Sequence, residues 1–326
     1  MMNSRNCCME SRQRRNTERR LWWQAGLLVM LIILALAIGS TSQLTLPVFL
    51  HVRLPRMLGC LLAGSGLAVA GMILQTVLAN PLASPNILGI QSGAGLMTVF
   101  SAALFPAAFG LRMPASFLGA FLASLFVMLL AKKVRASRST IVLAGLAVSQ
   151  IFSACIDLIL TLAPDSLTGY TDFRIGSLAG ITLNRLLFPA LCIVTATSLT
   201  LLCARQLELM QLGQRDAQCA GLDVNRWMLV FLALASLLAG SVISFTGMIG
   251  FVGLIVPHMV RRLSPGPLMK QLVSCLLLGP AFLLLADLLA RTVAAPYEIP
   301  AGILLTLAGG PYFLWLLLKG KGHGHD

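Results

Sequence analysis

The stretch MLGCLLAGSGLAVAGMILQTVLANPLASPNILGIQSGAGLMTVFSAALFPAAFGL, residues 57–111, decides the fold because it contains no charged residue. A helix rises 1.5 Å per residue and needs about 20 apolar residues to cross a bilayer, so the stretch is too long for one crossing. Asn80-Pro81 and Pro85-Asn86 interrupt it, since proline cannot continue the helical hydrogen bonds. It therefore predicts two membrane-spanning helices, at about 57–78 and 86–108.

The remaining apolar stretches extend this pattern on both sides. Residues 227–260 are again uncharged and too long for one helix, and the glycines around Thr246-Gly247 predict a break there. The sequence predicts ten membrane helices in all, at about 21–40, 57–78, 86–108, 114–131, 139–163, 186–204, two within 227–260, 268–290 and 299–318.

Composition supports an all-α polytopic membrane protein. Of 326 residues, 57% are hydrophobic and 11% charged, whereas soluble domains carry about 25% charged residues. The long Leu-, Ala- and Gly-rich runs also exclude an outer-membrane barrel, whose strands would be alternating segments of about ten residues.

The net charge of +13 reflects topology rather than nucleic-acid binding. With ten helices, 18 of the 24 Lys and Arg residues fall on the side of the two ends and 6 on the other side. Because basic residues concentrate in cytoplasmic segments, both termini are expected in the cytoplasm. The chain divides into a basic cytoplasmic tail (1–20), a ten-helix transmembrane domain (21–318) and a short cytoplasmic tail (319–326). Residues 1–37 could also form a signal peptide, but no polar segment follows their apolar core.

Few residues carry the chemistry of a catalytic or ion-coupled protein. The phosphate-binding loop Gly-x-x-x-x-Gly-Lys-Ser/Thr is absent from the sequence, so ATP is not bound in that way. Asp287 and Arg291 stand at i, i+4 spacing and are expected to pair, while Asp157 is either a buried anchor or a pathway residue. His323 and His325 are only a weak metal signal. The residues up to this point leave a secondary transporter working alone as an open alternative.

Two patterns concern helix packing. Gly59, Ala63, Gly66 and Ala70 form a seam of small residues along the helix at 57–78, which is typical of close packing between membrane helices. The sequence LLAGS, followed by GMI, occurs at 61–73 and again at 237–249, which is either an inverted repeat or a chance match.

Ordered motifs over about residues 45–318 resemble the FecCD/BtuC-type permease family. They are RLPR (53–56), NPLASPNILG (80–89) with Gly93-Ala94, GFVGLIVPH (250–258), LLAD (284–287) to Arg291, EIPAGI (298–303) and FLWL (313–316). Two places depart from the family pattern: SPGP (264–267) replaces an Asp-His-Arg run, and Gln214 replaces an acidic residue. These departures affect details of the cytoplasmic surface.

The resemblance implies the membrane subunit of a type II ABC importer in a bacterial inner membrane. Two permease copies, either a homodimer or a pair of paralogues, would enclose a central path. Two cytoplasmic ATPase subunits would bind and hydrolyse ATP, and a periplasmic or lipid-anchored binding protein would deliver the substrate. The expected substrate is a metal chelate, first an iron–siderophore and otherwise haem or cobalamin. The permease itself would hold no cofactor or metal and would not be an enzyme.

The resemblance also assigns roles to residues. A short helix at 214–220, within Gly213-x-x-x-Ala217-x-x-x-Gly221, is expected to present Ala217 to the ATPase, although a plain turn is the alternative. Arg53, Arg56 and Arg291 are expected to receive acidic residues of the binding protein, or else to anchor helix ends and pair with Asp287. The expected path and gate residues are Gly66, Ala70, Gln75, Asn80, Pro81, Ser139 and Thr140, the last two of which could instead cap a helix.

Overall fold

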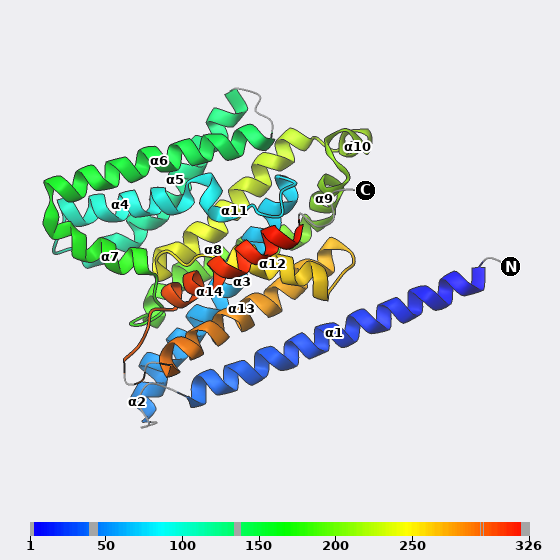
Figure 1. Ribbon diagram of the computed structural model, residues 1–326, viewed down its shortest axis with the longest axis horizontal. Helices are drawn as coiled ribbons and strands as arrows, with labels where there is room; N and C mark the ends of the chain where they lie inside the picture. Colours follow the sequence, from blue (N-terminus) through cyan, green and yellow to red (C-terminus); the bar gives the residue numbers. More distant parts are fainter. Residues whose placement is uncertain (1–2, 39–44, 134–137, 294, 296, 321–326) are drawn as a thin grey trace.

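The computed structural model describes residues 3–38, 45–133, 138–293, 295 and 297–320. Within these ranges the chain is all-helical and contains no strand (Figure 1). The α-helices are α1 (Asn3–Ala37), α2 (Leu46–Val48), α3 (Leu54–Val77), α4 (Ile90–Leu104), α5 (Arg112–Lys133), α6 (Arg138–Leu162), α7 (Leu167–Ile175), α8 (Leu183–Leu202), α9 (Ala204–Leu209), α10 (Gln214–Cys219), α11 (Val224–Thr246), α12 (Val252–Leu263), α13 (Leu268–Thr292) and α14 (Ala301–Gly320).

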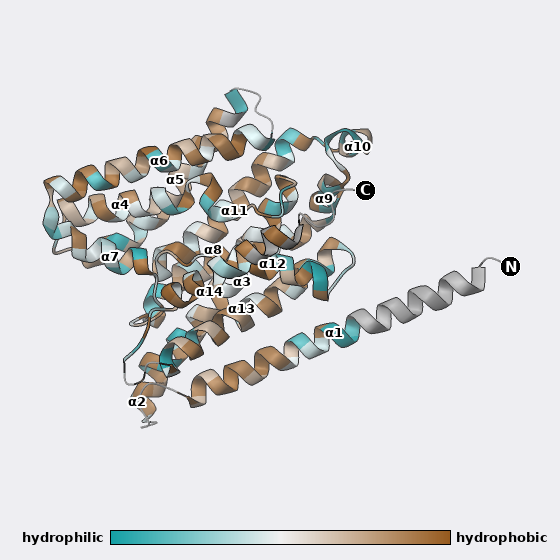
Figure 2. Cartoon of the chain, viewed as in Figure 1, coloured by the Kyte–Doolittle hydropathy of each residue, from teal (hydrophilic) through white to brown (hydrophobic). Residues whose placement is uncertain are grey.

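Seven helices are long and apolar enough to cross a membrane, which makes the chain a multi-pass membrane protein. Figure 2 shows the apolar residues along most of their length. Two further apolar helices among the described residues are shorter: α4 and α14, whose described apolar part is Ala301–Leu314. Helix α12 is also short, with 12 residues, and carries two arginines in its last turn. These seven and three helices correspond to the ten expected from the sequence, but the number of crossings stays a prediction.

Helix α3 lies at the centre of the bundle and packs against α8, α11, α12 and α13. Its glycines allow this close packing because they have no side chain, so the backbone of α3 can touch the backbones of neighbouring helices. A Cβ atom on Gly64 would stand 2.5 Å from the carbonyl oxygen of Gly279 in α13. A Cβ on Gly71 would overlap the carbonyl of Gly253 in α12. Small residues serve this purpose in membrane helices, where lipid provides no hydrophobic drive for association.

The break expected within 227–260 is confirmed. Helix α11 ends at Thr246, Gly247 adopts φ 72°, and α12 begins at Val252 after Phe251 at φ 67°. The Met248 amide donates to the Phe173 carbonyl over 2.8 Å, so α7 satisfies part of the interrupted backbone. Gly71, by contrast, lies inside continuous helix, so the two glycines of the GMI matches have different backbone roles.

The expected start of the second helix at 57 is wrong. The chain is helical from Leu46 through α2, a π-helical turn at Phe49–Arg53 and α3. Arg53 and Arg56 therefore lie within the helix rather than before it. Charged residues ended the apolar stretch in the sequence, but both have partners elsewhere in the fold: carboxylates for Arg56 and backbone carbonyls for Arg53.

The beginning of α1 and the end of α14 lie at the same end of the bundle as α9 and α10, and α2 and α7 lie at the opposite end (Figure 1). This placement agrees with an even number of crossings. We call the end with α10 the α10 end and the opposite one the α7 end. The assignment of the α10 end to the cytoplasm and the division into two tails and one domain remain predictions.

Candidate functional site

A buried cluster of two arginines and two carboxylates joins α3, α13 and the segment before α14 at the α7 end. Arg56 lies with Nη2 2.9 Å from Asp287 Oδ1 and Nε 3.1 Å from Oδ2, and its Nη1 donates to Glu298 Oε2 over 2.7 Å. Arg291 Nε lies 3.2 Å from Asp287 Oδ2, which confirms the expected i, i+4 pair. Asp287 is only 1% exposed, so its charge depends on the two arginines.

Arg53 is also directed into the protein. Its Nη1 donates to the carbonyls of Leu36 and Ala37 at the end of α1, over 2.7 and 2.8 Å. These carbonyls belong to the last turn of a helix, where backbone acceptors have no partner within the helix. Arg53 thereby ties α1 to the start of α3.

The expectation that Arg53, Arg56 and Arg291 present free guanidinium groups to a binding protein is wrong for this conformation. The three residues are 4%, 7% and 4% exposed. Their guanidinium groups already make contacts between helices of this chain. The same planar groups would be needed to bind carboxylates of a binding protein. A docking role for these residues would require the cluster to open.

Gln75 and Arg261 fasten α12 to α3. Gln75 Nε2 donates to the Gly253 carbonyl over 3.3 Å, at the start of α12 where the chain resumes its helix. Arg261 Nη1 donates to Gln75 Oε1 over 2.7 Å from the other end of α12. Both ends of α12 thus form a hydrogen bond with the buried side-chain amide of Gln75. Gln75 is therefore a packing residue rather than an exposed path residue.

The other path residues expected on and after α3 have similar environments. Ala70 is fully buried, and a Cβ on Gly66 would meet Val242 of α11 at 2.9 Å. A path between two copies of the chain must lie on a surface of each copy, so the prediction for Gly66 and Ala70 is corrected. Asn80 shapes the turn, since its Oδ1 accepts from the Leu82 amide over 2.9 Å, and Pro81 is exposed.

Helix α6 presents the polar surface that α3 does not. Exposed residues follow one face at alternating spacings of three and four, which places them on a single stripe. Several of them are polar, which is unusual for a membrane-facing surface. We call this set the α6 stripe: Ser139, Thr140, Gln150, Ser153, Asp157 and Thr161.

Asp157 belongs to the exposed α6 stripe. It is exposed near the α7 end of α6, which ends at Leu162, and is therefore not a buried anchor within one chain. The opposite face of α6 packs against the chain, because a Cβ on Gly145 would overlap the Ile87 carbonyl. Ser139 and Thr140 begin the stripe at the α10 end, and residues 134–137 just before them lie outside the described residues.

A cavity of about 650 Å³ opens at the α7 end, between α5, α7, α8 and α11. Arg112, Arg185 and Asp172 contribute charged side chains to its wall, and the Arg112 guanidinium lies 4.3 Å from the centre of the Phe109 ring. Sequence reasoning did not single out these residues. They belong to separate segments of the sequence, and only the fold brings them to one cavity.

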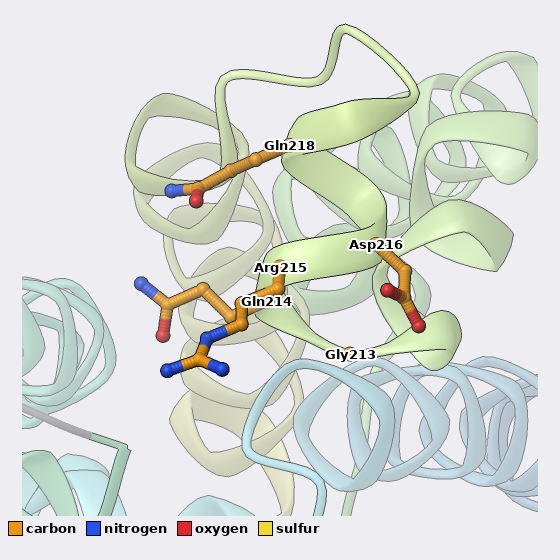
Figure 3. Close-up of a pocket in the computed structure, with 5 residues that line it drawn as sticks. All are labelled: Gly213, Gln214, Arg215, Asp216 and Gln218. Carbon is orange, nitrogen blue, oxygen red and sulfur yellow. The ribbon is translucent and has the colours of Figure 1, made fainter.

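Helix α10 exists as expected, and Figure 3 shows the polar side chains of Gln214, Arg215, Asp216 and Gln218 on it. Gln214, Arg215, Asp216 and Gln218 surround an open cavity of about 560 Å³ on its surface. Ala217 points inward and is fully buried, so the expectation that it forms the presented face is wrong. The spacing correctly located a helix between Gly213 and Gly221, but this apolar position packs onto the protein.

No group of three or more His, Cys, Asp or Glu side chains is placed to hold a metal ion in the described part of the chain. His323 and His325 lie outside it.

Comparisons with known proteins agree with this architecture. The family model described as the FecCD transport family matches residues 22–319. The hemin transport system permease protein of Yersinia pestis is 36% identical, covering 90% of this chain and 94% of its own. The Fe(3+) dicitrate transport system permease protein of Escherichia coli is also 36% identical, covering 87% of both chains.

A solved structure has the same fold. It shows an inward-facing transporter assigned to the metal-chelate ABC type, which is 29% identical to this chain with a TM-score of 0.85. The similarity covers 93% of this chain and 99% of that one. The chain is a membrane permease subunit, and it belongs to the FecCD transport family.

Proposed function

We propose that this chain is the permease subunit of an ATP-driven importer for a bulky metal chelate, with an iron–siderophore first and haem or cobalamin as the other candidates. The family match over residues 22–319 carries the proposal. In this arrangement both termini and α10 face the cytoplasm of a bacterial cell, and the permease lies in the inner membrane. ATP is bound and hydrolysed on two separate subunits, and a binding protein brings the chelate to the α7 end.

The proposed path lies between two permease copies along the α6 stripe. A lone copy would expose Asp157 and Gln150 to lipid, whereas a facing copy would enclose them around a water-filled passage. Exposed apolar residues such as Leu143, Leu146 and Ile151 lie between these polar groups. A mixed wall of this kind suits a large ligand that must pass without tight binding. The cavity at the α7 end supplies polar walls beside the proposed entrance.

The energy source distinguishes the proposal from a secondary transporter. The permease is reconstituted in vesicles with its ATPase and binding protein, and uptake of ferric hydroxamate, ferric citrate and haemin is measured. We expect uptake to need ATP and to persist after the membrane potential is collapsed. Uptake that needs the potential but not ATP would support the secondary transporter instead.

We predict that the exposed side of α10 carries the ATPase contact. The double change Arg215→Glu with Asp216→Arg keeps the net charge but exchanges the two charges around the α10 cavity. Exchanged charges at an interface slow association and weaken docking, so ATPase subunit binding to the purified permease should fall at least tenfold. Ala217→Arg is unsuitable because it would disrupt the packing of a buried residue.

The matched control is Asp172→Arg with Arg174→Glu on α7. Both residues are exposed and lie at the opposite end of the bundle (Figure 1). With no binding protein present, this control should bind the ATPase subunit normally. Equal binding by the α10 and α7 variants would place the ATPase contact elsewhere.

We also predict that the start of α6 approaches its counterpart in a second copy. Cysteine at Ser139 or Thr140, in a background with native cysteines replaced by serine, should form a crosslinked dimer that blocks uptake. Both positions are exposed at the end of the α6 stripe. Cysteine at Leu187, exposed on α8, serves as the control and should stay monomeric on denaturing gels. Absence of crosslinks at 139 and 140 in every nucleotide state would contradict a gate here.

A further inference from the structure

A basic pocket lies at the α10 end, where α1 meets the turn between α12 and α13. It has a volume of about 290 Å³ and is lined by Arg19, Arg20, Trp23, Gln24, Arg262 and Leu263. Arg20 Nη1 donates to the Leu263 carbonyl over 2.9 Å, and Gln24 Nε2 donates to Ser264 Oγ over 2.9 Å. These two bonds hold the walls of the pocket together across the fold.

One wall of the pocket contains an unused acceptor. Gln24 is 2% exposed, and its Oε1 atom is buried without a hydrogen-bond partner among the described residues. An unpaired buried acceptor is unfavourable. Because Gln24 lines the pocket, a small turn of its side chain toward the opening would let a hydroxyl or amine group of a lipid headgroup donate to this acceptor.

Within the described residues, no carboxylate pairs with the arginines of the pocket. None of the ion pairs in the described part of the chain involves Arg19, Arg20 or Arg262. Glu18 is the nearest carboxylate along the chain, and it forms none of these pairs either. Three guanidinium groups therefore face one opening with their charge available to an anion.

The pocket stands at the boundary of the apolar surface. Trp22 and Trp23 are 78% and 67% exposed, and the exposed apolar residues Val29, Met30 and Ile33 follow them on α1. Figure 2 shows this change from hydrophilic to hydrophobic residues along α1. Tryptophan with exposed indole and neighbouring arginine is typical of the depth at which lipid headgroups lie. At this level of the bilayer the neighbouring molecules are lipids, so a lipid headgroup is a better candidate ligand than a soluble protein.

We propose that this pocket binds the phosphate group of an anionic phospholipid, with Arg19 and Arg262 as its main ligands and Trp23 beside the glycerol region. Basic pockets between membrane helices are suited to such headgroups. Occupation of the site would join α1 to the α12–α13 turn, because Arg19 and Arg262 come from the two sides. The replacement of acidic and basic residues by SPGP at 264–267 leaves no carboxylate in this turn to compete.

The test measures tryptophan quenching by dibrominated phosphatidylglycerol and dibrominated phosphatidylcholine in vesicles. The permease carries Trp227→Phe and Trp315→Phe, so that Trp22 and Trp23 report the signal. We expect the protein to prefer phosphatidylglycerol. Arg19→Gln with Arg262→Gln removes two of the three guanidinium groups that face the opening, so it should weaken that preference at least tenfold. Arg19→Lys with Arg262→Lys should retain most of it.

The matched control is Arg205→Gln with Arg226→Gln, which removes the same charge from exposed positions outside the pocket. It should keep the preference, and an equal loss in both variants would overturn the proposal in favour of general charge attraction. Millimolar inorganic phosphate should not displace the lipid. If it abolishes the preference, the pocket is a soluble-anion site and the lipid proposal is wrong.

Discussion

Asp287→Asn is expected to lower the free energy of unfolding by about 3–5 kcal/mol, because it breaks a buried ion-pair cluster from its centre. Arg56 and Arg291 both depend on this carboxylate, which is 1% exposed. Asparagine has nearly the same shape but leaves two buried guanidinium groups with only Glu298 as a counter-charge. Thermal unfolding of the purified permease in detergent and its yield in the membrane would both fall.

Asp223→Asn is the matched control for this change. Asp223 pairs with Arg226 over 3.1 Å, but both side chains are largely exposed. Its side chain also accepts from the Arg226 amide at the start of α11, a role that asparagine fills equally well. We therefore expect a change of no more than about 1 kcal/mol. If the two variants unfolded at the same temperature, the buried cluster would contribute little to stability.

The cluster also changes how binding-protein docking must be tested. Arg56→Glu would place a third carboxylate beside Asp287 and Glu298, so it would disrupt folding before it could report on docking. Loss of uptake in that variant would not distinguish docking from misfolding. Arg112 and Arg185 in the cavity at the α7 end are better positions for such a test, because neither belongs to the cluster.

Gly71→Ala is expected to destabilise the permease by at least about 3 kcal/mol and to abolish uptake. The new methyl group would overlap the Gly253 carbonyl, and backbone cannot rotate away as a side chain can. Displacing Gly253 would also break its hydrogen bond with Gln75, which holds the beginning of α12. Thermal unfolding and vesicle uptake measure the two effects.

Gly26→Ala on α1 provides the comparison, because no atom lies within 4 Å of the new methyl group. Alanine has the higher helix propensity, so this variant should be as stable as the parent or up to about 1 kcal/mol more stable. A Gly71→Ala protein with normal stability would show that α3 and α12 can separate at little cost.

Hydropathy along the chain was sufficient to predict an all-helical membrane protein and most helix positions. The uncharged stretches at 57–111 and 227–260 were correctly divided, because proline and glycine act on the backbone of their own segment. The ordered motifs identified the family, and i, i+4 spacing predicted the Asp287–Arg291 pair. The short helix α7 was missed, since its nine residues carry no strong periodic pattern.

The site was harder to predict than the fold. Arg56 and Asp287 are 231 positions apart, and no local pattern indicates that they meet. Gly66 and Ala70 looked suitable for a path because they are small, but small residues also allow two helices to pack closely. The polar residues of the α6 stripe share one helical face in the sequence, yet their spacing alone does not say whether that face is covered.

By itself, the sequence determined that this chain crosses a membrane as helices. It also gave the ends of most of those helices to within several residues, the start of the second helix excepted. Solvent preference and backbone geometry depend on each segment's own residues, so they can be deduced without knowing the neighbours. Only the tertiary structure decided that Arg53, Arg56, Gln75 and Ala217 face inward while Asp157 faces outward. Burial of a side chain depends on which other helix lies against it, and that is a property of the packed bundle.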